Sequence, residues 1–163
     1  MQRITPYLWF DHQAEAAADF YVDVFEDSRV LEVTRYLENS PGPAGSVVTV
    51  RMDLDGLEVT ALNGGPVFTI TPAVSLVVTC ETQEEIDRLW ERLTDGGEEV
   101  QCGWLTDRFG VSWQIVPAGL DAMLNSPDRA AAQRANDAML KMIKLDIAEL
   151  RRAFEGEGAY TSE

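Results

Sequence analysis

Few side chains in this 163-residue sequence could support acid–base or nucleophilic chemistry. His12 is the single histidine, which excludes a His-rich metal site, and we interpret it as a surface residue at the start of a helix. Cys102, beside Gly103-Trp104, is the strongest candidate nucleophile, and its thiolate would need a nearby cation such as Arg108. The alternative, which we favour, is a buried and inert cysteine, because free cysteine is usually buried. Cys80 ends an apolar run and is interpreted as a core residue.

Two other residues could line a ligand pocket. Trp104 has the best claim among the four tryptophans, because it neighbours a glycine close to a loop. Asn63 precedes Gly64-Gly65 and either contacts a ligand or only terminates a strand. No spacing among the lysines and tyrosines singles out a general base.

The charge balance restricts the partners. A formal net charge of −15 repels phosphate backbones and anionic lipid, so we expect neither nucleic acid nor a membrane surface as partner. No stretch approaches the roughly 20 apolar residues of a membrane span. Two cysteines without CxxC spacing predict a reduced, cytoplasmic protein.

Strand and helix signals in the first half follow the order βαβββ. A β-branched and aromatic run leads to Asp11, a predicted helix N-cap, and then to apolar residues at helical spacing that begin with Ala14. Asp55-Gly56 predicts a hairpin turn. The predicted strands are residues 4–10, 29–36, 46–54 and 57–62.

The same order recurs in the second half. Thr82 and Glu85 predict a capping box, and Gly96-Gly97 end the helix. The predicted strands are residues 73–80, 100–105 and 111–116. Such a repeat predicts an α+β fold in which two βαβββ modules form a curved mixed sheet around a central cup.

After Pro117 the composition favours helices. Ser126-Pro127 predicts the start of one helix and Asp146 the start of another. The predicted organisation is one structural domain with modules at residues 1–66 and 67–117, C-terminal helices at 118–155 and a flexible tail at 156–163.

Several motifs resemble one protein family. They are residues 4–10 (ITPYLWF), 18–21 (ADFY), 60–65 (TALNGG), 101–105 (QCGWL) and 107–117 (DRFGVSWQIVP). With the doubled βαβββ order, they resemble the vicinal-oxygen-chelate superfamily of glyoxalase I, bleomycin-resistance proteins and extradiol dioxygenases, and within it the PhnB-like branch. Members of this branch often carry a label related to a demethylubiquinone methyltransferase, but the sequence has no strand–GxGxG–helix loop for a methyl donor.

The resemblance also indicates where a metal would bind. Metal-using members hold a divalent ion with His, Glu or Gln from the first and last strands of each module. The matching positions here are Thr5 or Pro6, Thr60 with Glu58 nearby, Ala73 or Val74, and Gln114. A single amide is a poor anchor for a first-row ion, so we expect neither a metal nor another cofactor.

The favoured function is therefore metal-free binding of a small molecule in the cup, with the activity undetermined. Asn63, Cys102, Trp104 and Gln114 are the predicted ligand-binding residues, and no catalytic residue is assigned. One alternative is a divalent-metal-dependent lyase, isomerase or dioxygenase with atypical ligands, in which Glu58 would join Gln114. Another is a non-catalytic interaction module, in which the apolar helix face from Ala131 to Phe154 builds a homodimer or packs on its own domain.

Overall fold

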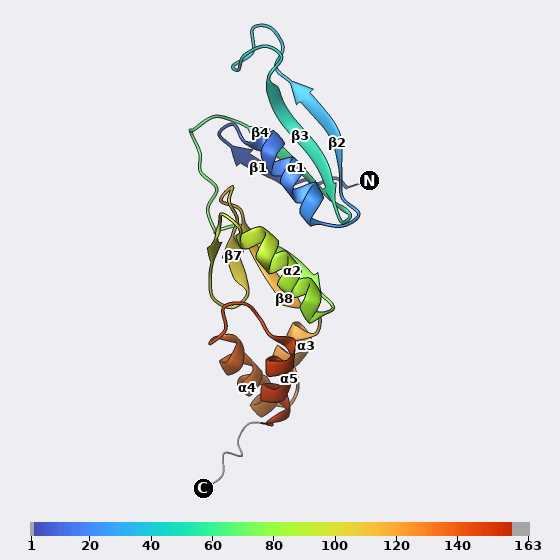
Figure 1. Cartoon of the computed structure of the whole chain (residues 1–163), viewed down its shortest axis with the longest axis vertical. Coiled ribbons are helices and arrows are strands. Elements are labelled where there is room, and N and C mark those ends of the chain that lie inside the picture. Colours follow the sequence, from blue (N-terminus) through green and yellow to red (C-terminus); the bar gives the residue numbers. More distant parts are fainter. Residues whose placement is uncertain (1, 158–163) are drawn as a thin grey trace. The chain divides into compact units, whose positions relative to one another are not determined.

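The computed structural model describes residues 2–157. The chain divides into two compact units, Met1–Thr71 and Pro72–Glu163, and each contains a four-stranded mixed sheet with one covering helix (Figure 1). The predicted α+β fold with two βαβββ modules and C-terminal helices is thereby confirmed, and the sheets are open rather than closed. The module boundaries at 66 and 117 stay predictions, and most of the predicted tail lies outside the described residues.

The first unit builds its sheet in the order β1-β4-β3-β2. β1 pairs in parallel with β4, and the other pairs are antiparallel. On β3, Val50, Met52 and Leu54 are buried beneath α1, as the period of two of a strand requires, while Arg51 and Asp53 occupy the opposite face. The elements are β1 (Tyr7–Phe10), α1 (Ala14–Val24), β2 (Arg29–Arg35), β3 (Val47–Leu54) and β4 (Leu57–Asn63).

The predicted hairpin turn is confirmed. Asp55 and Gly56 have φ values of 46° and 89°, the left-handed pair that a two-residue hairpin loop needs. The Gly56 N–H donates to Asp53 Oδ1 over 2.8 Å, which fixes the turn.

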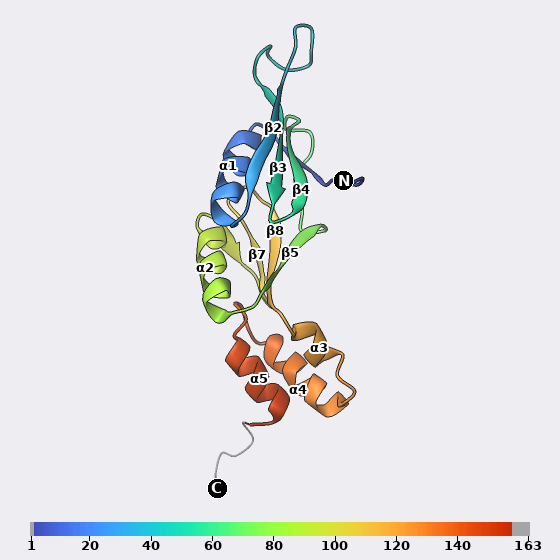
Figure 2. The same ribbon diagram turned by 90° about the vertical axis from the view of Figure 1, so that its right-hand side faces the viewer.

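The second unit repeats this topology in the order β5-β8-β7-β6. α2 packs on β5, β7 and β8, and the C-terminal helices follow β8 (Figure 2). The predicted N-cap is confirmed, because Thr82 Oγ1 accepts from the Glu85 N–H, whereas Glu85 Oε2 accepts from the N–H of Glu81 and not of Thr82, as a capping box would require. The elements are β5 (Ser75–Cys80), α2 (Gln83–Thr94), β6 (Glu98–Glu99), β7 (Trp104–Thr106), β8 (Ser112–Pro117), α3 (Leu120–Leu124), α4 (Arg129–Met139) and α5 (Ile147–Glu155).

The strand predicted at residues 100–105 is wrong in its extent. Cys102 and Gly103 both have positive φ, 61° and 81°, so the backbone turns between the short strands β6 and β7. The positive φ of Cys102 could not be predicted from the sequence, because residues other than glycine rarely adopt it.

The C-terminal helices pack within their own unit. Leu120, Met142, Leu145 and Leu150 form a buried cluster that Val116 of β8 also contacts. Gln83 joins this cluster to α2, donating to the Leu145 carbonyl oxygen over 3.1 Å and accepting from the Ile147 N–H over 2.9 Å.

Of the two helix starts that the sequence predicts in this region, one is confirmed and one is wrong. Asp146 is the N-cap of α5 as predicted, with Oδ1 accepting from the Glu149 N–H. The start predicted at Ser126-Pro127 is wrong, because Asp128 caps α4 by accepting from the N–H groups of Ala130 and Ala131. No helix within residues 2–157 is long and apolar enough to cross a membrane.

Candidate functional site

A pocket of about 410 Å³ lies on the face of the second sheet that α2 leaves uncovered. Cys80, Trp113 and Ile115 are buried on the α2 face, so the alternating residues Val77 and Gln114 lie on the other face. The pocket is lined by strand residues Val77, Thr79, Trp104, Gln114, Val116 and Pro117, by Cys102 of the turn before β7, and by Ala118, Gly119, Leu120, Asp121, Leu124 and Met139.

The Gln114 side chain is held in place on the sheet face that forms the floor of the pocket. Its Nε2 donates to Ser75 Oγ over 3.0 Å, from β8 to the neighbouring parallel strand β5. One of the two amide N–H groups is therefore engaged, and Oε1 has no hydrogen-bond partner among residues 2–157. Gln114 thus offers a fixed acceptor at the pocket floor.

The turn that carries Cys102 is fixed by the C-terminal extension. The N–H groups of Cys102 and Gly103 donate to the carbonyl oxygens of Met142 and Ile143, over 2.9 and 2.8 Å. A side chain at Gly103 would lie 2.8 Å from the Ile115 carbonyl oxygen and 3.0 Å from Leu145, so only glycine fits there. This close packing places the side chains of Cys102 and Trp104 on the pocket.

The other cysteine has a different environment. Cys80 is fully buried at the end of β5, and this burial, with a contribution from Glu85, raises the pKa of its thiol to about 12. A thiol that stays protonated at neutral pH is a poor nucleophile. The prediction that Cys80 belongs to the core is confirmed.

Asn63, the fourth predicted ligand residue, lies in the first unit at the end of β4. Its Oδ1 accepts from the Ala14 N–H over 2.8 Å, and its Nδ2 donates to the Val47 carbonyl oxygen over 3.1 Å. Its backbone carbonyl oxygen accepts from the Tyr36 hydroxyl. These bonds give Asn63 a role in joining α1, β3 and β4.

This arrangement corrects the predicted cap of α1. Asp11 does not cap the helix, and Gln13 at the N-cap position makes no side-chain cap bond. The first orphan N–H of α1, on Ala14, is satisfied instead by Asn63, which is 49 residues away in sequence.

His12 and three of the tryptophans have no part in the pocket. The His12 side chain is 79% exposed, beside Asp11, in agreement with its interpretation as a surface residue. Trp9, Trp90 and Trp113 donate their indole N–H groups to the Gly65 carbonyl oxygen, Glu99 and Asp107. Trp104 is the one that lines the pocket.

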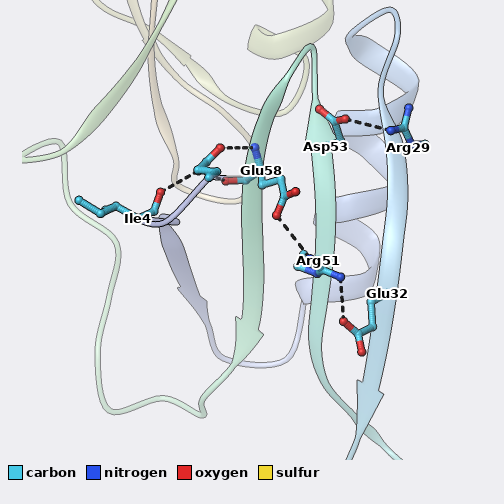
Figure 3. A network of polar contacts seen from close by, with 7 residues as sticks. Ile4, Arg29, Glu32, Arg51, Asp53 and Glu58 are labelled. Atoms are coloured by element: carbon cyan, nitrogen blue, oxygen red, sulfur yellow. Dashed lines mark hydrogen bonds and ion pairs between the residues drawn. The ribbon is translucent and has the colours of Figure 1, made fainter.

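The first sheet carries a charged network on the face opposite α1 (Figure 3). Arg51 on β3 lies between Glu58 on β4 and Glu32 on β2, with nitrogen–oxygen distances of 3.4 and 3.1 Å. Asp53 pairs with Arg29 at 3.3 Å. Glu58, the carboxylate that a metal-dependent mechanism would recruit, is therefore already paired with a cation.

The residues at the expected metal positions do not fit a divalent ion. Thr5 and Pro6 precede β1, Val74 precedes β5 and is 72% exposed, and Gln114 is bonded to Ser75. Within residues 2–157, no three His, Cys, Asp or Glu side chains come together in a group that could hold a metal. Hydroxyl and amide groups alone are weak ligands for first-row ions, so we derive no reaction step through a metal.

The sequence could not identify the wall of the pocket. Leu120, Asp121 and Leu124 of α3 and Met139 of α4 line it, but α3 is a five-residue helix that begins after Gly119 with φ 102°. Its shortness leaves no apolar periodicity to detect. Gly119 before a Leu-Asp pair is the only local signal, and it is a weak one.

Comparisons with known proteins identify the family. The family model described as 3-demethylubiquinone-9 3-methyltransferase matches residues 2–116. The chain belongs to this family. The PhnB protein from Bacillus cereus is similar to it with 40% identity and a TM-score of 0.66, over 72% of this chain and 100% of that chain.

More distant solved structures share the fold alone. Protein PA1353 from Pseudomonas aeruginosa has 22% identity and a TM-score of 0.59, over 72% of this chain and 98% of that chain. The fosfomycin resistance protein FosX from Listeria monocytogenes, solved with Mn(II) and sulfate, has 15% identity and a TM-score of 0.54, over 76% of this chain and 98% of that chain. No curated protein matches the chain. The predicted membership of the vicinal-oxygen-chelate superfamily and its PhnB-like branch is confirmed.

Proposed function

We propose that this PhnB-like protein binds a small molecule, without a metal ion, in the pocket of its second unit. The observation that carries the proposal is the meeting of Cys102, Trp104 and Gln114 in one concave, mostly apolar site. Such a site, with few placed polar groups, is the usual form of a small-molecule pocket. Asn63 is not part of this proposal, because its side-chain amide is used in joining α1 to the sheet.

The methyltransferase in the family description is not part of the proposal either. A methyl donor of the nucleotide type needs a glycine-rich loop between a strand and a helix, and the sequence has no GxGxG motif.

A thermal-shift screen tests this function. Metabolites would be added to the metal-free protein in a chelating buffer, and a compound that binds should raise the melting temperature to a saturating value. Gln114→Leu should fold normally and lose most of that response. Gln133→Leu is the matched control, because Gln133 is exposed on α4 and bonds only to Asp137 among the described residues. An equal response in all three proteins would overturn the proposal.

The protein is also proposed to be a cytoplasmic homodimer. Two free cysteines suit a reducing compartment, and the exposed Leu140 and Ile143, 53% and 49% accessible, supply apolar area outside the buried cluster of the extension. Light scattering on Leu140→Glu/Ile143→Glu tests the dimer. It should convert a dimer of the parent protein into a monomer, and a parent protein that is already monomeric would contradict the proposal.

A further inference from the structure

The charge on the lining of the pocket in the second unit is negative. Among the described residues that line it, Asp121 is the only aspartate, glutamate, lysine, arginine or histidine. The surrounding chain carries a formal net charge of −15. Both the local carboxylate and the overall field favour a cation in the pocket over an anion.

The uncharged polar group of the lining can also bond a cation. One N–H of the Gln114 amide is bonded to Ser75, so Oε1 and the second N–H are left for a ligand. Oε1 can accept an ammonium N–H, while the preference for a cation over an anion comes from Asp121.

The aromatic wall adds a third contribution. The Trp104 ring lines the pocket among apolar residues that include Val77, Val116 and Leu124. An indole attracts a cation through its negative face, more strongly than the other aromatic side chains do. The apolar residues would at the same time accept the hydrocarbon part of the ligand.

One feature of the pocket acts in the opposite sense. The first residues of α3 line it, and the N-terminus of a helix favours anions. With five residues, however, α3 has a small dipole, and Asp121 in its first turn offsets that dipole. The balance therefore still favours a cation.

Asp121 lies outside the part of the chain that the family model matches. The match ends at residue 116, so α3, Asp121 and Met139 lie beyond it. The pocket therefore combines Trp104 and Gln114 of the matched part with residues of the C-terminal extension.

We infer that the pocket selects a small organic cation, a primary or secondary ammonium on an apolar body, with Asp121 and Gln114 Oε1 as acceptors and Trp104 as the aromatic wall. This inference rests on the proposed function. It goes further by excluding carboxylates and phosphates as preferred ligands and by assigning Asp121 as the specificity-determining residue.

Three probes of similar shape test the charge preference: 2-phenylethylamine, 2-phenylethanol and phenylacetate. The readout is protection of Cys102 from alkylation by iodoacetamide, an uncharged reagent, at neutral pH with peptide mass spectrometry. Cys102 lines the pocket, while Cys80 is fully buried and serves as the internal reference. The amine should protect Cys102 at a concentration at least about fivefold lower than the alcohol does, and phenylacetate should not protect it.

Variants assign the effect to Asp121. Asp121→Asn should bring the amine and the alcohol to within about twofold of each other. Glu91→Gln changes the net charge equally on α2, outside the pocket, and should leave the fivefold preference unchanged. A preference that survives in Asp121→Asn, or disappears in Glu91→Gln, would overturn the assignment.

The outcomes separate the two proposals. Equal protection by the alcohol or the acid would keep the pocket as a ligand site and overturn the cation preference. No protection by any of the three probes at millimolar concentrations, together with no hit in the metabolite screen, would overturn both.

Discussion

The side-chain amide of Gln114 donates to the hydroxyl of Ser75 across 3.0 Å, and so joins β8 to β5 on the floor of the pocket. Breaking this bond should release the amide without unfolding the sheet, because both residues are part-buried and the strands pair through their backbones. Ser75→Ala is expected to weaken ligand binding by about threefold to tenfold, since a mobile acceptor must be ordered on binding. Titration of a ligand from the screen measures this.

A positioning role for Ser75 can be separated from direct contact. Ser75→Thr restores the hydroxyl and should recover most of the affinity, while the melting temperature without ligand stays close to that of the parent protein. If Ser75→Ala binds as tightly as the parent protein, the hydrogen bond does not position Gln114.

The cap of α1 by a residue of β4 gives a prediction about stability. Asn63→Ala should lower the free energy of unfolding by about 1 to 3 kcal/mol, because it leaves the Ala14 N–H and the Val47 carbonyl oxygen without their partner. Asp11→Ala is the control suggested by the sequence, and it should cost less than about 0.5 kcal/mol because Asp11 caps nothing. Urea denaturation measures both. A larger cost for Asp11→Ala than for Asn63→Ala would contradict the structure.

Gly103 should be the least replaceable glycine near the pocket. Gly103→Ala combines a positive φ of 81° with a close approach to the Ile115 carbonyl oxygen and Leu145, and should destabilise the protein by about 2 to 4 kcal/mol. Gly45→Ala has nearly the same φ, 84°, with no atom within 4 Å, and should cost about 1 kcal/mol. The difference between the unfolding free energies of Gly103→Ala and Gly45→Ala, measured by thermal or urea unfolding, therefore gives the cost of the steric contacts at Gly103. Equal costs would mean that the turn at Cys102 can move away from Leu145.

The buried thiol of Cys80 predicts a loss of stability in alkali. Its pKa is raised from 9.0 to about 12 on folding, so the thiol binds a proton more tightly in the folded state. The resulting stabilisation is fully present below pH 9 and is lost as the pH rises towards 12, with a slope of up to about 1.4 kcal/mol per pH unit. Cys80→Ala removes the contribution of this thiol to the pH dependence, and the cavity that it leaves costs the same free energy at every pH. The unfolding free energy of the variant should therefore fall less steeply above pH 9 than that of the parent protein. Parallel slopes for the two proteins would contradict the assigned burial.

Sequence reasoning succeeded where local patterns and the repeat agree. The N-caps at Thr82 and Asp146 and the Asp55-Gly56 turn depend on residues within one or two turns of each other, and all three are present. The helix and most strands of each unit followed from the repeated module, but the two-residue strand β6 was missed. Trp104 was chosen for its neighbouring glycine and Gln114 from the resemblance to the family, and the two are cross-strand neighbours in the structure.

The failures at α1, at Cys102 and in the pocket wall involve contacts between residues distant in sequence, whereas the start of α4 was misplaced by two residues within one local motif. Asn63 caps α1 from another strand, so neither Asp11 nor Gln13 carries the signal. The turn at Cys102 depends on the carbonyl oxygens of Met142 and Ile143, and the pocket wall depends on how the extension packs against β8. No local periodicity encodes such contacts, and Asp121 could not be found for this reason.

Metal-free binding can be tested by calorimetric titration of a screened ligand into the protein after exhaustive chelation, repeated with Mn²⁺ added and with Gln114→Leu. We expect the same dissociation constant with and without Mn²⁺, and at least about fivefold weaker binding to Gln114→Leu. Binding that requires the metal, or that is unaffected by the loss of Gln114, would contradict a metal-free site on the second sheet.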